Sequence, residues 1–161
     1  MGGVDINTFW EHSRNGANLS PLAEWIGQRV RGTVPPPAVA FGQTPAEAEQ
    51  LARAVLAGQK TTATSMLWQY DDDIPLPEMG DLAIVVDGAG TPRALILTTE
   101  VRVVPFSDVD EAHALGESAS LEAWRNEQAA AATAADDGNH PLTPDTPMVL
   151  ERYELLYPVS G

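Results

Sequence analysis

Apolar residues near the start of the chain follow a helical spacing. Residues 5–14 place three large apolar side chains on one side, which predicts a short helix docked on a core: Ile6, Phe9 and Trp10. A second helix is expected over 19–30, and the prolines of 34–37 must end it in an extended segment. Residues 1–40 are therefore expected to form a helical extension at the N-terminus.

The clearest predicted helix runs from Pro45 to Ala57. Thr44 is a typical N-cap, Pro45 suits the first helical position, and Glu47 completes a capping box. Gly58 follows the last turn as a C-terminal stop signal. The residues expected to face the core are Leu51, Val55 and Leu56.

The pattern after Gly58 changes to strands, with turn residues at 87–90. The expected strands are 60–68, 82–86, 93–104 and 148–157. Several strands with few helices between them predict an α+β protein built on a small barrel or closed sheet. Helices are expected at 111–117 and 120–135, although the alanine-rich stretch within 128–147 lacks large apolar residues and indicates a loosely held, flexible excursion. We expect a single domain over 1–161.

Composition narrows the range of partners. The formal charge of −14 disfavours long duplex nucleic acid, but a nucleoside or a short single strand remains compatible with it. The sequence contains no cysteine, so thiol chemistry is excluded. It shows no secretory leader and no apolar run of membrane-spanning length, and we therefore expect a soluble cytoplasmic protein that binds no membrane.

Lys60 is the only lysine among nine basic residues. An ammonium group can lose its proton when buried, whereas arginine stays charged, so the two residues differ in acid/base chemistry. The chain uses arginine at its other basic positions, which indicates that an arginine could not perform the role of the residue at position 60. The structural alternative is a lysine kept by chance at the C-terminal end of a helix, where it complements the helix dipole.

Four hydroxyl side chains follow Lys60 within five positions. In a strand, Thr62 and Thr64 share a face with Lys60, whereas Thr61 and Ser65 lie on the other face. A desolvated lysine can activate a hydroxyl nucleophile, although threonine is also common in purely structural strands. Two acids could pair with the amine. These are Glu100, which could equally face solvent in its strand, and Glu117, which follows a predicted helix.

Other polar clusters predict no metal site and no cofactor. His12, His113 and His140 lack the spacing of metal ligands. The acids of 71–73 precede a proline and are better explained as a solvated loop than as a cation site. Trp68 and Tyr70 could stack on a flat base, but aromatic residues in strands more often belong to a core.

Taken together, the motifs make the chain resemble the ASCH family, and within it the small stand-alone bacterial proteins. The matching pieces run in order over nearly the whole chain: 40–42, the G-x-K-T signature at 58–61, 67–70, 75–77 with 80–81, 87–88, 98–101 with 104–106, 121–125 and 149–153. The resemblance implies a PUA-like mixed β-barrel with flanking helices. It also implies an association with RNA or modified nucleosides through a cleft lined by the lysine motif.

One branch of the family, the N4-acetylcytidine amidohydrolases, is similar at two positions. Lys60 matches its catalytic lysine, and Glu117 matches its catalytic glutamate. The branch's threonine three residues after the lysine is Ala63 here, so that nucleophile is missing. The stretch after Arg125 is a second departure, because relatives carry aromatic residues where this chain has alanines.

Three functions stay open after this comparison. The first is binding of a nucleoside or short RNA, the second is hydrolysis of a modified nucleoside such as N4-acetylcytidine, and the third is ribonuclease activity, which the negative charge disfavours. The candidate catalytic residues are Lys60, Glu117, Thr62 and Thr64. The candidate ligand-binding residues are Thr61, Ser65, Trp68, Tyr70, Glu100, Trp124, Arg125 and Arg152.

Overall fold

The computed structural model describes residues 5–16, 36–42, 44–135 and 138–158. The helix expected at 19–30 lies outside these residues. Of the described helices, none is long and apolar enough to cross a membrane.

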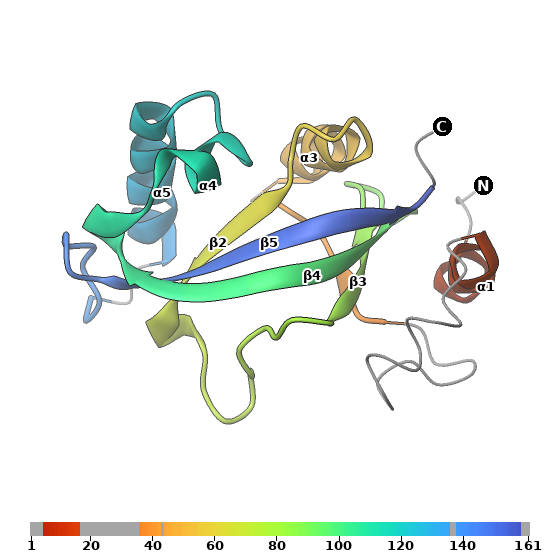
Figure 1. Cartoon of the computed structure of the whole chain (residues 1–161), viewed down its shortest axis with the longest axis horizontal. Helices are drawn as coiled ribbons and strands as arrows, with labels where there is room; N and C mark the ends of the chain where they lie inside the picture. Colours follow the sequence, from red (N-terminus) through yellow and green to blue (C-terminus); the bar gives the residue numbers. More distant parts are fainter. Residues whose placement is uncertain (1–4, 17–35, 43, 136–137, 159–161) are drawn as a thin grey trace. The chain divides into compact units, whose positions relative to one another are not determined.

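The described strands form one five-stranded mixed sheet (Figure 1). Its order is β1 (Ala38–Val39), β3 (Leu82–Val86), β4 (Pro92–Pro105), β5 (Pro147–Tyr157) and β2 (Thr62–Met66). β1 runs parallel to β3, whereas the pairs β3–β4 and β2–β5 are antiparallel. The α+β class with a mixed sheet is therefore confirmed. Within the described residues β1 and β2 are edge strands, so the barrel is not closed by the strands seen here.

The residues pack as two compact units. Unit 1 comprises residues 1–59, 79–99 and 153–161, as far as they are described, and unit 2 comprises 60–78 and 100–152. Both β4 and β5 contribute residues to each unit.

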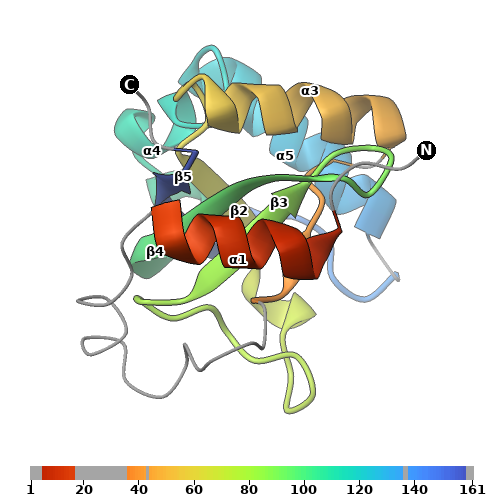
Figure 2. The same ribbon diagram turned by 90° about the vertical axis from the view of Figure 1, so that its right-hand side faces the viewer.

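Unit 1 contains the helix α1 (Ile6–Gly16). Asp5 Oδ1 accepts a hydrogen bond from Thr8 N at 2.9 Å and so caps the first turn of this helix. Figure 2 shows α1 lying across β3 and β4. Phe9 and Trp10 are buried against the sheet, which confirms the predicted docking helix. Their sheet partners in this core cluster are Leu82, Ile84, Leu95 and Leu97.

Another helix among the described residues of unit 1, α3 (Pro45–Leu56), begins as its caps predict. Thr44 Oγ1 accepts from Glu47 N at 3.1 Å, and Gly58 takes a φ of 76° just beyond the end of the helix. Val55 is fully buried, whereas Leu51 and Leu56 are only partly buried. The predicted core face is therefore confirmed at Val55, and the other buried residues of the helix are Ala48 and Ala52.

Unit 2 packs two helices, α4 (Glu111–Leu115) and α5 (Leu121–Ala135), next to each other (Figure 1). Its two 3₁₀ turns are η2 (Leu67–Gln69) and η3 (Phe106–Asp108). Ser120 Oγ accepts from Ala123 N at 3.0 Å and so caps α5 as expected. The core cluster of this unit is Met66, Val109, Ala114, Trp124, Ala132, Met148 and Leu150.

The alanine-rich part of α5 takes part in this core, which differs from the expectation that it lies outside it. Ala132 is buried with Trp124. The two residues are eight positions apart, so they fall on one helical face, and a small side chain suffices where the helix approaches its neighbours closely.

Candidate functional site

The start of β2 is attached to the end of α4 by backbone hydrogen bonds. Thr61 N and Thr62 N both donate to Gly116 O, at 2.7 and 3.3 Å. Thr62 is fully buried, and its Oγ1 donates to His113 O at 2.8 Å. A Cβ on Gly116 would lie 2.5 Å from Thr62 Oγ1, so only glycine allows this approach. These hydrogen bonds hold the segment after Lys60 next to Glu117.

Lys60 lies buried in this region, with only 6% of its side chain exposed. Its Nζ donates to Thr62 O at 2.7 Å and lies 4.0 Å from Glu117 Oε1. Burial lowers the pKa of Lys60, because the charged form loses its hydration, while the nearby carboxylates of Glu117, Glu151 and Glu127 oppose that shift. The expected pairing of this lysine with Glu117 is therefore present in the structure.

The other carboxylate oxygen of Glu117 is surrounded by donors. Oε2 accepts from Thr64 Oγ1 in a short hydrogen bond and from Trp124 Nε1 at 3.0 Å, and it lies 3.2 Å from His113 Nε2. Burial alone would raise the pKa of Glu117, but the hydrogen bond from His113, the charge of Lys60 and the remaining donors hold it below its usual value. Glu117 is thus held as a carboxylate.

His113 completes the network, although its sequence context predicted no role for it in the site. Its ring is buried, and Nε2 lies 2.8 Å from Thr64 Oγ1. Thr64 donates its single hydroxyl hydrogen to Glu117, so the hydroxyl must accept from His113, and Nε2 must carry a proton. The four-residue spacing of His113 and Glu117 across a predicted helix end was the signal that could have identified it.

On the opposite face of β2, Ser65 pairs with the hydroxyl of Tyr70, which directly follows η2. Ser65 Oγ and Tyr70 OH are 2.5 Å apart, and burial raises the pKa of Tyr70. Trp68 stacks on His140 with ring centroids 4.1 Å apart and planes 6° from parallel. By strand alternation Ala63 lies on this face, away from the Lys60–Glu117 pair.

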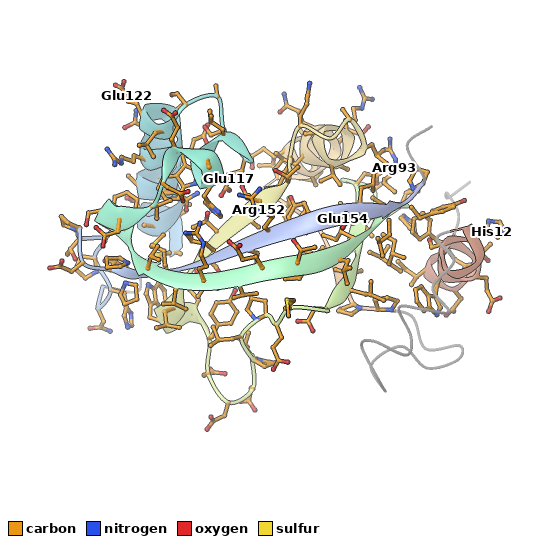
Figure 3. All side chains as sticks on the ribbon, viewed as in Figure 1. His12, Arg93, Glu117, Glu122, Arg152 and Glu154 are labelled. Atoms are coloured by element: carbon orange, nitrogen blue, oxygen red, sulfur yellow. The ribbon has the colours of Figure 1, made fainter. Side chains whose placement is uncertain are left out.

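The remaining predicted site residues are distributed over unit 2. Glu100 is half exposed and forms an ion pair with Arg102 at 2.9 Å. Trp124 is fully buried and supports Glu117, and Arg125 is exposed on α5. Arg152 lies on β5 opposite Thr62. Glu117 and Arg152 are both labelled in Figure 3.

The acidic residues 71–73 form an exposed turn, as interpreted from the sequence. Asp71 Oδ1 accepts from Asp73 N and Ile74 N at 2.8 and 2.9 Å. These hydrogen bonds fix the Asp71 carboxylate against the backbone of its own turn. Within the part of the chain that the structure describes, no group of three histidine, aspartate or glutamate side chains could hold a metal ion.

These contacts define a site with three chemical elements. It combines a buried amine with a lowered pKa, a carboxylate held in its charged form, and a hydroxyl whose proton points to that carboxylate. Such a set can bind a polar ligand edge that offers both an acceptor and a donor. It can also orient a hydroxyl for attack on a carbonyl carbon.

The comparisons with known proteins agree with this fold. The family model described as the ASCH domain matches residues 37–157. A crystal structure of a protein from Enterococcus faecalis has a TM-score of 0.74 and 24% identity, covering 94% of this chain and 90% of that one. An ASCH domain from Lactobacillus crispatus has a TM-score of 0.65 and 24% identity, covering 91% of this chain and 95% of that one. Among the curated proteins, none matches the chain.

Proposed function

We propose that this chain, which belongs to the ASCH domain family, binds a nucleoside or a short RNA element through Lys60 and Glu117. The observation that carries the proposal is the buried amine–carboxylate pair, whose charged atoms lie 4.0 Å apart. Burying two charges costs free energy that an apolar pair would not cost, so such a pair is more common at functional sites than in ordinary cores.

The pair is suited to the polar edge of a base. The Lys60 ammonium donates hydrogen bonds, and Glu117 Oε1 accepts them. A base edge presents donors and acceptors side by side, so it can contact both groups at once. The association of the family with RNA, implied by the resemblance above, supports this class of ligand. The negative charge of −14 favours a small ligand over a long one.

Binding can be measured by titration calorimetry with ribonucleosides, N4-acetylcytidine and short single-stranded RNA. Lys60→Ala should weaken binding at least tenfold, because a hydrogen bond to a charged group contributes about 1.5–3 kcal/mol. Arg53→Ala is the matched control, since 72% of that side chain is exposed on α3. Equal affinity in the wild type and in Lys60→Ala would exclude this site.

Hydrolysis of an amide on a modified nucleoside is the second candidate, favoured by one contact. Thr64 Oγ1 donates to Glu117, so Thr64 could replace the hydroxyl missing at Ala63, with Glu117 receiving its proton. Thr62 is less suited, because its hydroxyl already donates to His113 O inside the core. The lowered pKa of Glu117 makes it a weak base, which favours binding over cleavage.

Release of acetate from N4-acetylcytidine tests this second candidate directly. Activity should disappear in Lys60→Ala, Glu117→Gln and Thr64→Val, while Thr133→Val, at an exposed position of α5, should retain it. If the wild-type protein releases no acetate, hydrolysis of this substrate is ruled out, and the binding proposal stands on calorimetry alone.

A further inference from the structure

The strand β2 has one side that pairs with β5 and one side that faces away from it. Within the described residues β2 is the last strand of the sheet, so no further strand pairs with this second side, which we call the outer edge. In a strand, residues two positions apart direct their main-chain N–H and C=O groups to the same side. The direction of a few of these groups therefore fixes that of the others.

Hydrogen bonds at both ends of β2 show which residues face the outer edge. Thr62 N donates to Gly116 O at 3.3 Å, so this N–H points away from β5. Met66 N donates to Gln69 Oε1 at 2.9 Å, which gives it the same direction. Thr64 lies midway between these two residues, so its N–H and C=O also face the outer edge.

Thr64 has an open main chain between two residues whose N–H groups are occupied. Among the contacts of the described residues, neither Thr64 N nor Thr64 O has a hydrogen-bond partner in the protein. Its neighbours on the same face, Thr62 and Met66, are buried, whereas Thr64 is partly exposed. Main-chain donors and acceptors in folded proteins are nearly always paired, so an open pair in this setting is a position where a ligand can bind.

The open groups of Thr64 lie beside the charged pair. Lys60 Nζ donates to Thr62 O at 2.7 Å. This carbonyl is next to the N–H of Thr64 on the outer edge, because the C=O of one residue and the N–H of the residue two positions later face the same side. Thr64 Oγ1 bonds Glu117 Oε2, so Thr64 also borders the carboxylate. A ligand held by Lys60 and Glu117 therefore meets the main chain of Thr64.

A small ligand fits this opening, whereas a peptide strand does not. Addition of a strand to a sheet edge uses main-chain groups at several alternate residues. Here the N–H groups of Thr62 and Met66 are already bonded within the chain, so the opening is limited to the residue between them. One donor and one acceptor side by side match the amide or amidine edge of a planar ring.

We infer that Thr64 binds the ligand through its main-chain N–H and C=O, which take up a ring edge that carries an acceptor next to a donor. Lys60 and Glu117 then contact the polar groups that flank this edge. The inference rests on the proposed function and adds the element that recognises the ring. A ring without an adjacent acceptor and donor lacks the two-point contact and binds more weakly.

The test follows amide hydrogen exchange by NMR in isotope-labelled protein, free and saturated with adenosine, guanosine, cytidine or uridine. In the free protein the Thr64 amide should exchange about tenfold faster than those of Thr62 and Met66, because exchange requires an N–H that is not hydrogen-bonded. A bound nucleoside should slow exchange at Thr64 by about tenfold and shift its resonance. Gln69→Ala is the matched control. It removes the acceptor of the Met66 N–H, so exchange there should accelerate, and the nucleoside should not slow it.

The outcomes separate this inference from the function on which it rests. Nucleoside binding that depends on Lys60 but leaves the Thr64 amide unshifted would overturn the role of the Thr64 main chain alone. Slow exchange of this amide in the free protein would also overturn it, since the N–H would then already have a partner. Absence of binding by all of these nucleosides would overturn both. The decision compares free and bound wild-type protein, so it does not depend on the folding of a variant.

Discussion

Both units of the molecule bury polar residues beside an apolar core, but they bury charge in different ways. The core of unit 1 is formed by apolar side chains from α1, β3 and β4. Ser13, Thr98 and Asp87 are also buried in this unit, and Asp87 pairs with Arg93, which is partly exposed. Unit 2 also has an apolar core, but Lys60, Thr62 and His113 are buried beside it. Burial of polar groups lowers stability unless each finds a partner, and every one of these three has one.

This difference between the units indicates which buried charges serve stability and which belong to the functional site. In unit 1 the buried carboxylate of Asp87 accepts from Ala89 N and Thr91 N of its own turn and pairs with the partly exposed Arg93, so folding alone explains this charge. Unit 2 differs at Lys60 and Glu117, where both members of an ion pair are kept out of water. A departure of this kind is expected where a site needs fixed charges in a medium of low dielectric constant.

The largest expected effect is on stability, from Trp10→Ala in unit 1. Trp10 is 1% exposed, and its removal leaves a large cavity between α1 and the sheet. We expect a loss of about 3–5 kcal/mol in the free energy of unfolding, measured by urea denaturation with circular dichroism.

If unit 1 serves stability alone, the folded Trp10→Ala protein should bind its ligand with wild-type affinity. A large change in affinity would show that the comparison between the units is wrong. Trp10→Phe, which preserves much of the volume, should recover more than half of the lost stability.

A smaller effect with a distinctive pH dependence is expected for Glu117→Gln in unit 2. The folded-state pKa of Glu117 is lower than its ordinary value of 4.5, so the unfolded state binds the proton more tightly. The stabilisation it provides is complete above that value and disappears as pH falls through the lowered pKa. Near pH 7 the variant should be about 2 kcal/mol less stable than the wild type, because Lys60 loses its counter-charge.

The difference between the two proteins should narrow as pH falls below 4.5, which urea titrations between pH 7 and pH 3 can follow. Glu122→Gln on the exposed side of α5 is the matched control and should follow the wild type throughout. A difference that stays constant down to pH 3 would contradict the assignment of Glu117 as a carboxylate stabilised by its partners.

The smallest effect is expected for Arg93→Gln in unit 1. This arginine bonds Glu49 at 3.2 Å and Asp87 at 3.1 Å, but 28% of its side chain is exposed. Solvent screens such pairs, so the loss should be less than about 1 kcal/mol by the same denaturation assay. A loss comparable to that of Glu117→Gln would mean that the charges of unit 1 and unit 2 are not different in kind.

Local signals explain which elements were predictable. The helix α3 was predicted to within one residue at its end, because Thr44, Pro45 and Gly58 act on their own turn of backbone. The strand β3 was predicted with its observed bounds, since its apolar run is flanked by turn residues. The two-residue strand β1 was missed, because nothing in Ala38–Val39 itself signals a strand before β3 is present to pair with it.

The residues of the site were predicted only in part, because composition and family resemblance indicate residues but not the contacts between them. Lys60 stands out by composition, and the family resemblance indicated Glu117 as its partner. Their distance, the proton arrangement through Thr64 and the participation of His113 needed the structure, because they join residues about fifty positions apart. The resemblance also identified Arg152 among the ligand-binding candidates, but its place opposite Thr62 follows only from strand register.

The amino-acid sequence by itself determined the capped helices, the alternating strands, the strongly negative charge and the one lysine, because each depends on neighbouring residues or on composition. The tertiary structure decided which of the hydroxyls after Lys60 meets Glu117, and that Ala63 faces away from the pair. The reason is geometric: strand alternation sorts side chains onto two faces, and only the packing of α4 and α5 determines which face becomes the site.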